Sequence, residues 1–400
     1  MNEVGIASRE ASKYQAVGIT DEALQKAQEM VGVWLRRDVH WPAIAEPLSL
    51  HDIRRWAMYS VGDDNPLWSE ADYGKQSVWG RNIAPPTFLY TIDSTIVAPG
   101  LPGIQWIHGA TRWEHFLPVG VGDTIRARAR VIKLTEKKGA RAPRFLIQTG
   151  EVLYLNQREE LVARAETDIL RVPRAASGEG MNHGDADGGQ VEPPRYSDDE
   201  IAELYEHYQN EIPRGSEPRY WESVEIHHDL PRIAKGPLTL VDIMAFYAGR
   251  RTVYNPLRVA FKERIRHPRN VYVSPRTNVP VHPAAGHFDV DIAHEVGMPG
   301  AYDQGWMRTN WLGHLVTDWM SDFGFVRKLD VRLLRPNLVN DLTWCHGRVE
   351  DKRVENGEHL VDIVLWADNQ RNERSAEGRA VVRLPSRSVD DGVLLAGARS

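Results

Sequence analysis

Two groups suited to proton transfer and charge stabilisation lie eighteen residues apart in the second half of the chain, at His287 and Gly305. An imidazole can take up and return a proton near neutral pH. Gly305 begins a segment whose large apolar residues recur every three or four positions, and this spacing predicts a buried helix over 306–320. The N–H groups at such a helix start have no intrahelical partner and lie at the positive end of the dipole. They can therefore bind a carbonyl oxygen that becomes negatively charged during reaction.

Other readings of these residues stay open at this stage. His287 could serve packing or a loop hydrogen bond instead of catalysis. His282, five residues earlier, could supply a second polar group, although a histidine in a proline-rich loop is more often structural. Asp289 and Asp291 are expected to cap or orient the following helical turn.

The pattern occurs twice in the chain, which predicts a tandem duplication. Positions 68 and 86 align with 287 and 305 at one offset of 219, and Asn-Pro-Leu occurs at both 65–67 and 255–257. Residues 48–170 and 238–384 should therefore form equivalent units, with helices 87–97 and 306–320 in corresponding places. The second copy carries an insert at 258–286, which is expected to loop out.

The stretch YSVGDDNPLWSEADY resembles the signature of MaoC-like acyl dehydratases and R-specific enoyl-CoA hydratases, and HFDVDIAHEVG resembles the second part of that signature. The resemblance implies an α+β tandem (double) hotdog, each half a long helix packed on an antiparallel sheet. It implies hydration of 2-enoyl-CoA, or the reverse dehydration of 3-hydroxyacyl-CoA. The expected partner is an acyl-CoA or acyl-carrier-protein thioester, with no further cofactor and no metal, in a homodimer or with a partner hotdog subunit.

In the family, an aspartate and a histidine of one hotdog activate the added water together, and neither copy here keeps both. The first copy keeps Asp63 and Asn65 but has Trp68 at the histidine position, and Pro86, which has no N–H, at the carbonyl-binding position. Asp63 is therefore either catalytic or a turn and cap residue left from the duplication. Asn65 is assigned to substrate binding by the resemblance.

The second copy keeps His287 and Gly305 but has Val253 at the aspartate position and Arg258 after its Asn-Pro-Leu. A composite site of Asp63 with His287 would require the two copies to bring these loops together. The alternative function is a catalytically silent subunit that binds acyl-CoA or stabilises an active partner.

The insert is basic, and a coenzyme A tail would suit its charge. The residues expected to contact the phosphates are Arg264, Arg266 and Arg269. A solvated loop or a dimer contact explains the same charges equally well.

Composition sets the remaining limits. Four hundred residues suit two cores, and a net charge of −6 argues against a nucleic-acid binder. The single cysteine, Cys345, fits a reducing cytoplasm, and the apolar runs are too short for a membrane span. We expect a cytoplasmic protein with domains at 16–173 and 196–388, separated by a flexible linker at 174–195.

Local patterns place the elements that would position these residues. Helices are predicted after Thr20 and after Ser197, each with a capping residue at its start, and over 49–60. Alternating and β-branched residues predict antiparallel strands over 124–134, 144–156 and 160–170, and in the second copy around 329–334, 342–351, 359–369 and 379–385.

Overall fold

The computed structural model describes residues 18–39, 44–101, 104–138, 144–173, 191–249, 257–266, 271–274, 276–295 and 298–388. Ten strands form one antiparallel sheet in the order β1-β3-β4-β5-β2-β9-β12-β11-β10-β6. Their bounds are β1 Trp34–Val39, β2 Gln105–His115, β3 Arg126–Lys137, β4 Phe145–Leu155, β5 Leu161–Val172, β6 Ile233–Lys235, β9 Phe325–Leu333, β10 Thr343–Glu355, β11 Glu358–Asn369 and β12 Arg374–Arg383. The seven strands predicted from alternation are confirmed as β3–β5 and β9–β12.

The two halves join through one strand pair, β2 with β9. Ala110 pairs with Arg332 and Glu114 with Lys328, so the strands run antiparallel. The start of β2 therefore lies beside the end of β9. This register places residues just before Ala110, in the first half, next to Leu333 in the second.

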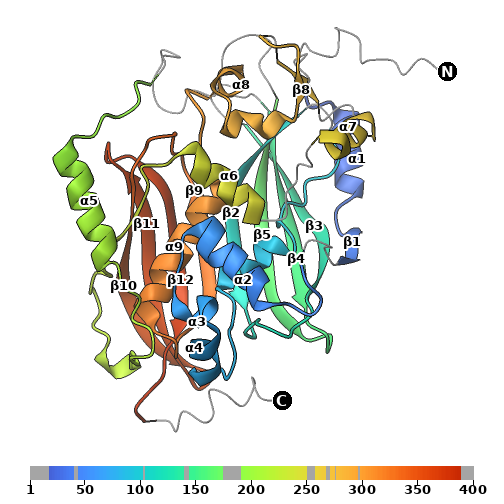
Figure 1. Ribbon diagram of the computed structural model, residues 1–400. Helices are drawn as coiled ribbons and strands as arrows, with labels where there is room; N and C mark the ends of the chain where they lie inside the picture. Colours follow the sequence, from blue (N-terminus) through green and yellow to red (C-terminus); the bar gives the residue numbers. More distant parts are fainter. Residues whose placement is uncertain are drawn as a thin grey trace.

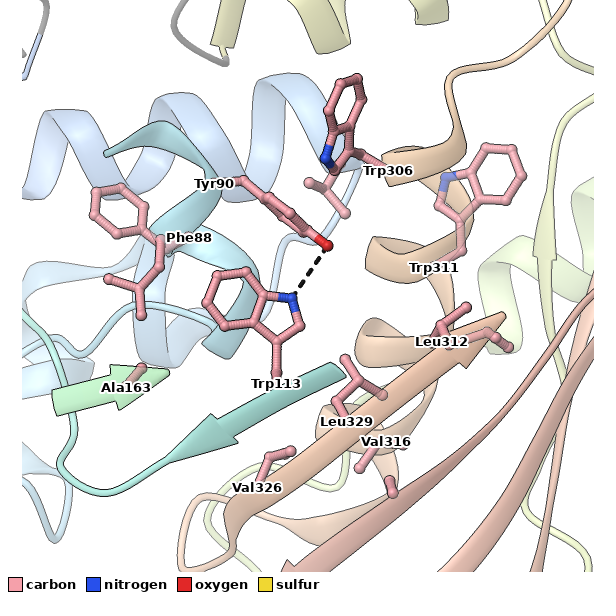
Figure 2. Packing of buried hydrophobic residues seen from close by; sticks show 14 of the residues in the cluster. Phe88, Tyr90, Trp113, Ala163, Trp306, Trp311, Leu312, Val316, Val326 and Leu329 are labelled. Atoms are coloured by element: carbon pink, nitrogen blue, oxygen red, sulfur yellow. Dashed lines mark hydrogen bonds between the residues drawn. The ribbon is translucent and has the colours of Figure 1, made fainter. Parts of the chain in front are cut away.

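The central helix α9, Gly305–Met320, is confirmed at the predicted place. Fourteen of its sixteen residues are buried, so the helix is enclosed all round and not merely on one stripe. It lies against the sheet of the second half and also approaches β2 and the 3₁₀ helix η3 (Pro86–Thr91) of the first half (Figure 1). The apolar residues of α9 meet those of both halves in one core (Figure 2), where the Trp113 indole donates to the Tyr90 hydroxyl at 3.1 Å.

The first half lacks the long helix expected over 87–97. Only the short η3 forms, and the chain then continues without regular structure to Gly100. The β-branched residues and Pro99 that follow disfavour an α-helix. Asp93 instead accepts the N–H of Thr95, which fixes a non-helical turn. The duplication is thus unequal at its central helices.

A bent helical segment carries the chain to Asp63. Ser49 and Asp52 form a capping box at the start of α2 (Leu50–Trp56), which confirms the helix predicted there. The helix widens into the π-helix η2 (Ala57–Val61) and ends at Gly62, which adopts φ 70°. Asn65 then caps the short α3 (Pro66–Ser69), and α4 (Ala71–Gln76) follows.

The remaining helices surround this framework. The capped helices predicted after Thr20 and Ser197 are confirmed as α1 (Asp21–Glu29) and α5 (Asp198–Asn210). The others are η4 Trp221–Ser223, α6 Leu240–Gly249, η6 Pro283–His287 and α8 Val290–Glu295. The described part of the insert contains α7 (Leu257–Arg266) and the two-stranded sheet of β7 (Tyr272–Val273) with β8 (Pro280–Val281). Most of the predicted linker, 174–190, lies outside the described residues.

Candidate functional site

His287 ends η6, and its ring is held by the loop that precedes α9. Its Nδ1 lies 3.0 Å from the carbonyl oxygen of Tyr302, and the ring packs at 4.2 Å from the Tyr302 ring. A carbonyl oxygen only accepts hydrogen bonds, so Nδ1 carries the hydrogen. In the neutral ring the lone pair is then on Nε2, which is the protonation state that a general base needs.

Gly305 begins α9, whose N-terminus is not capped by a side chain. Gln304 occupies the N-cap position without accepting a backbone N–H, and its amide instead donates to the Tyr247 hydroxyl. The described helices α1, α2, α3 and α5 all have a capping side chain. The first-turn N–H groups of α9 are therefore not satisfied by a cap and can bind an oxygen atom.

A buried ion pair fixes the loop between His287 and α9. Nε of Arg308 lies 2.9 Å from Oδ2 of Asp303, and Asn337 donates both its backbone N–H and its side-chain amide to that carboxylate. Burial raises the pKa of Asp303 to about 6, although Arg308 and Asn337 act in the opposite direction. Both carboxylate oxygens are engaged, so Asp303 holds the loop and is not oriented for catalysis.

His287 and Gly305 line the same pocket, which has a volume of about 140 Å³. The predicted pair is thus brought together. One wall of this pocket comes from the first half, at Gln105–His108 on β2. Sequence reasoning missed His108. Its proximity depends on the β2–β9 pairing, for which the local sequence contains no signal.

Asp63 does not line that pocket, so the composite site of Asp63 with His287 does not form in this arrangement. The carboxylate is 2% exposed, and Nε2 of His314 on α9 lies 3.6 Å from its Oδ1. The same Nε2 is 3.1 Å from Asp318, and the His314 Nδ1 is 2.6 Å from Nζ of Lys235. Four titratable groups from both halves therefore form one buried cluster.

The pKa values in this cluster follow from burial and mutual charge. Burial raises the pKa of Asp63, against the attraction of His314. Burial alone would lower the pKa of His314, but the carboxylates of Asp63 and Asp318 outweigh it and raise that pKa. Oxygens and nitrogen of these three residues are close enough to hold a metal ion. A protonated Lys235 amine beside Nδ1 would repel a metal ion bound at this cluster. A metal-bound imidazole is normally oriented by donating its other N–H to an acceptor, and a protonated amine cannot accept that hydrogen bond.

The matching pocket of the first copy is nearly filled. Trp68 and Pro86 line a cavity of about 40 Å³, against about 140 Å³ in the second copy. His115 of β2 donates from Nε2 to the Pro86 carbonyl at 3.2 Å. Asn65, predicted to bind substrate, is buried and uses its Oδ1 to accept the N–H of Leu67 at 2.9 Å.

His282 occupies a capping position and not that of a free acid. Its Nδ1 accepts the N–H of Ala284 at 3.1 Å at the start of η6. Burial, with the charges of Arg264 and His287, lowers the pKa of His282 to about 4, so the ring is neutral at physiological pH. Arg264 therefore lies close enough to His282, five residues before His287, for its charge to lower the pKa of that ring. Val253, Arg269 and the side chain of Arg266 lie outside the described residues.

Asp289 accepts the N–H of Ile292 at 3.2 Å and so caps the start of α8, as expected from the sequence. Asp291 instead pairs with Arg276 of the insert at 2.5 Å, and this pair holds the insert against α8. None of the helices in the described parts of the chain has the length and apolar content needed to cross a bilayer.

Comparison with known proteins identifies the fold. Residues 39–165 match the family model described as FAS1-like, dehydratase domain region. A solved MaoC-like dehydratase aligns with TM-score 0.60 and 16% identity, covering 90% of this chain and 99% of that one. A MaoC domain protein dehydratase from Chloroflexus aurantiacus aligns with TM-score 0.54 and 13% identity, covering 88% and 96%.

A further solved structure bears directly on the architecture. A conserved protein from Mycobacterium tuberculosis, described as having a double hotdog fold, aligns with TM-score 0.54 and 14% identity, covering 87% of this chain and 95% of that one. No curated protein matches the chain. The predicted double hotdog fold and the resemblance to MaoC-like proteins are thereby confirmed.

Proposed function

We propose that this chain, whose double hotdog fold is similar to that of MaoC-like dehydratases, catalyses addition of water to a 2-enoyl thioester, or the reverse dehydration of a 3-hydroxyacyl thioester. The observation that carries this proposal is the shared pocket of His287 and Gly305. A base with a fixed tautomer and an uncapped helix N-terminus are the two groups that this chemistry needs. The family match to a dehydratase region supports the same reaction class.

The reaction follows from the atoms at the two ends of the pocket. The thioester carbonyl accepts the N–H at Gly305. As a water oxygen bonds to C3, the electron pair of the double bond moves toward that carbonyl and an enolate forms, stabilised by the positive helix end. Nε2 of His287 takes a proton from the water and then delivers a proton to C2. The product has gained one water, and His287 has returned to its neutral state.

The charge near the pocket supports coenzyme A as the acyl carrier. Arg264 is placed by the insert near His282, and the neighbouring arginines of the insert have the same charge. Coenzyme A carries phosphates that such charges would attract, and we take acyl-CoA as the substrate class. An acyl-carrier-protein thioester has one phosphodiester on its arm and would therefore make fewer ionic contacts with the arginines of the insert.

Turnover of crotonyl-CoA by the purified chain tests the proposal. We compare the wild type with His287→Asn, because the asparagine amide can still donate to the Tyr302 carbonyl while the Nε2 base is lost. The variant should fold normally and lose about 10²-fold or more in kcat. Equal turnover in the two proteins would contradict the proposal.

The alternative of a catalytically silent subunit has one observation in its favour. His282 precedes His287 by five residues, the spacing that separates the aspartate from the histidine in the family signature, and its ring is used as a helix cap. If the wild type binds crotonyl-CoA in calorimetry but turns over neither this nor longer enoyl-CoAs, the chain is a binding subunit.

A further inference from the structure

His108 enters the pocket of the second half from a strand of the first half. It precedes Gly109, where the pairing of β2 with β5 shifts in register between His108 and Ala110. Such an irregularity re-aims the side chains beside it. The His108 ring packs at 5.1 Å from the ring of Trp306, the second residue of α9. His108 is thereby held at the start of the central helix.

The nitrogen of His108 that faces Gly305 is Nδ1. A methyl group placed on Gly305 would lie 3.0 Å from this atom. The imidazole of the first half is thus adjacent to the helix N-terminus at which the thioester carbonyl is proposed to bind. His287 lines the same volume of about 140 Å³, so the pocket contains imidazoles from both halves.

A chain of buried hydroxyls defines the tautomer of His108. The hydroxyl of Thr167 donates to Thr95 at 2.7 Å, so its single hydrogen is used there. Thr167 must then accept from Thr111, which lies 3.3 Å away, and this uses the hydrogen of Thr111. Thr111 can only accept from His108 Nε2, at 2.7 Å. The hydrogen of the neutral ring is therefore on Nε2, and the lone pair is on Nδ1.

On the basis of the proposed function, we propose that His108 is the second polar group of the reaction, accepting a hydrogen bond from the attacking water at Nδ1. Nε2 of His287 accepts the other water hydrogen, which it removes as the oxygen attacks C3. The water is then oriented by one imidazole from each half of the duplication. This arrangement supplies the polar group that the family obtains from an aspartate, whereas Asp63 is committed to His314.

Three substitutions at position 108 test the contributions of Nδ1 and Nε2 to turnover separately. His108→Asn places an amide oxygen where Nδ1 was and has no group to reach Thr111. His108→Gln places an amide nitrogen near the Nε2 position and has no acceptor at Nδ1. His108→Leu matches the branching of asparagine without polar atoms. His115→Gln is the control, because His115 lies on the same strand but at the nearly filled pocket of the first copy.

If Nδ1 orients the water, kcat with crotonyl-CoA falls about 10²-fold in His108→Gln and His108→Leu, with KM within about threefold, while His108→Asn retains most of the activity. His115→Gln keeps the wild-type rate. Activity retained by Gln but lost by Asn would overturn the inference, because the contact with Thr111 would then be the important one. Equal activity in all three variants would also overturn it.

The design distinguishes this inference from the proposed function. A wild type that turns over crotonyl-CoA, is inactivated by His287→Asn and is unaffected by His108→Leu would retain the function and exclude the role of His108. A wild type that turns over no enoyl-CoA of any length would overturn both. Circular dichroism melting of each variant detects loss of folding, and a fall in kcat at an unchanged melting temperature supports the role in catalysis.

Discussion

Nε2 of His314 lies 3.6 Å from Oδ1 of Asp63, and this contact joins the signature loop of the first half to the central helix of the second. In the family this aspartate would face a histidine two residues beyond its Asn-Pro pair. Here that place is taken by Trp68, which is 2% exposed and fills the space. Asp63 is thus an ionisable group held between the halves, with Lys235 and Asp318 completing the cluster.

This placement predicts an effect on stability and not on turnover. Replacing Asp63 by alanine leaves His314 and Lys235 buried with less compensating charge, which should cost about 3–5 kcal/mol in the free energy of unfolding. Turnover per folded molecule should fall far less than in His287→Asn. Urea unfolding and initial rates on the same samples measure both quantities.

A double-mutant cycle isolates the contact itself. Asp63→Asn and His314→Gln should be non-additive by more than about 0.5 kcal/mol, because the two groups touch. Additive losses would show that the pair contributes nothing beyond its separate burial. A loss of turnover equal to that of His287→Asn, in folded protein, would restore Asp63 as a catalytic residue.

Local patterns were sufficient for seven strands, for α9 and for half of the site. Alternation predicted β3–β5 and β9–β12, and apolar spacing predicted α9, because each depends on residues close together in the sequence. The pairing of His287 with Gly305 followed from their spacing in one signature. These predictions hold because loop length and helix start are local properties.

The remaining features depend on contacts between the halves. The partner of Asp63 is His314, 251 positions away, and the approach of His108 to Gly305 requires the β2–β9 register. The long helix predicted over 87–97 was wrong because the resemblance suggested equal halves, whereas the β-branched residues and Pro99 that follow η3 disfavour an α-helix. Short strands such as β1 and β6 have too few residues to show a period.

Gly305 is expected to tolerate no side chain. A methyl group there would lie 2.5 Å from Cδ1 of Leu333 and 3.0 Å from Nδ1 of His108, so Gly305→Ala must displace both walls of the pocket. Overpacking of this kind costs about 1–3 kcal/mol, and kcat/KM for crotonyl-CoA should fall by about 10-fold or more. Gly300→Ala is the matched control, since no atom lies within 4 Å of its added methyl group. Similar kinetics for both variants would argue against Gly305 as the binding position.

The basic insert is expected to act on affinity. Neutralising Arg264, Arg266 and Arg269 together should raise KM for crotonyl-CoA about 10-fold with kcat nearly unchanged, because exposed pairs contribute only ~0–1 kcal/mol each but act together on the phosphates. The KM of the wild type should also rise more steeply with ionic strength than that of the triple variant. Arg276→Gln is the control, because Arg276 is paired with Asp291. Indistinguishable salt dependence would assign the insert to folding or to a dimer contact.

His115 gives the protein a pH-dependent stability that can be measured separately from activity. Burial, together with the charge of Arg327, lowers the pKa of His115 from its ordinary value of 6.5 to about 4, despite carbonyl contacts that act in the opposite direction. Between these two values the unfolded chain binds more protons than the folded one at this position. Folding stability must therefore rise with pH from about 4 to 6.5 and fall as the solution is acidified through that window.

The variant His115→Gln should remove this dependence while retaining a donor for the Pro86 carbonyl. A shift of this size corresponds to about 3 kcal/mol at full protonation, so the wild type should lose roughly that much more stability than the variant between pH 7 and pH 4. His282, whose pKa is also lowered to about 4, contributes with the same sign and remains in both proteins. Urea unfolding at closely spaced pH values measures the difference. Parallel stability curves for the two proteins would show that the His115 ring is protonated as readily in the folded chain as in the unfolded one.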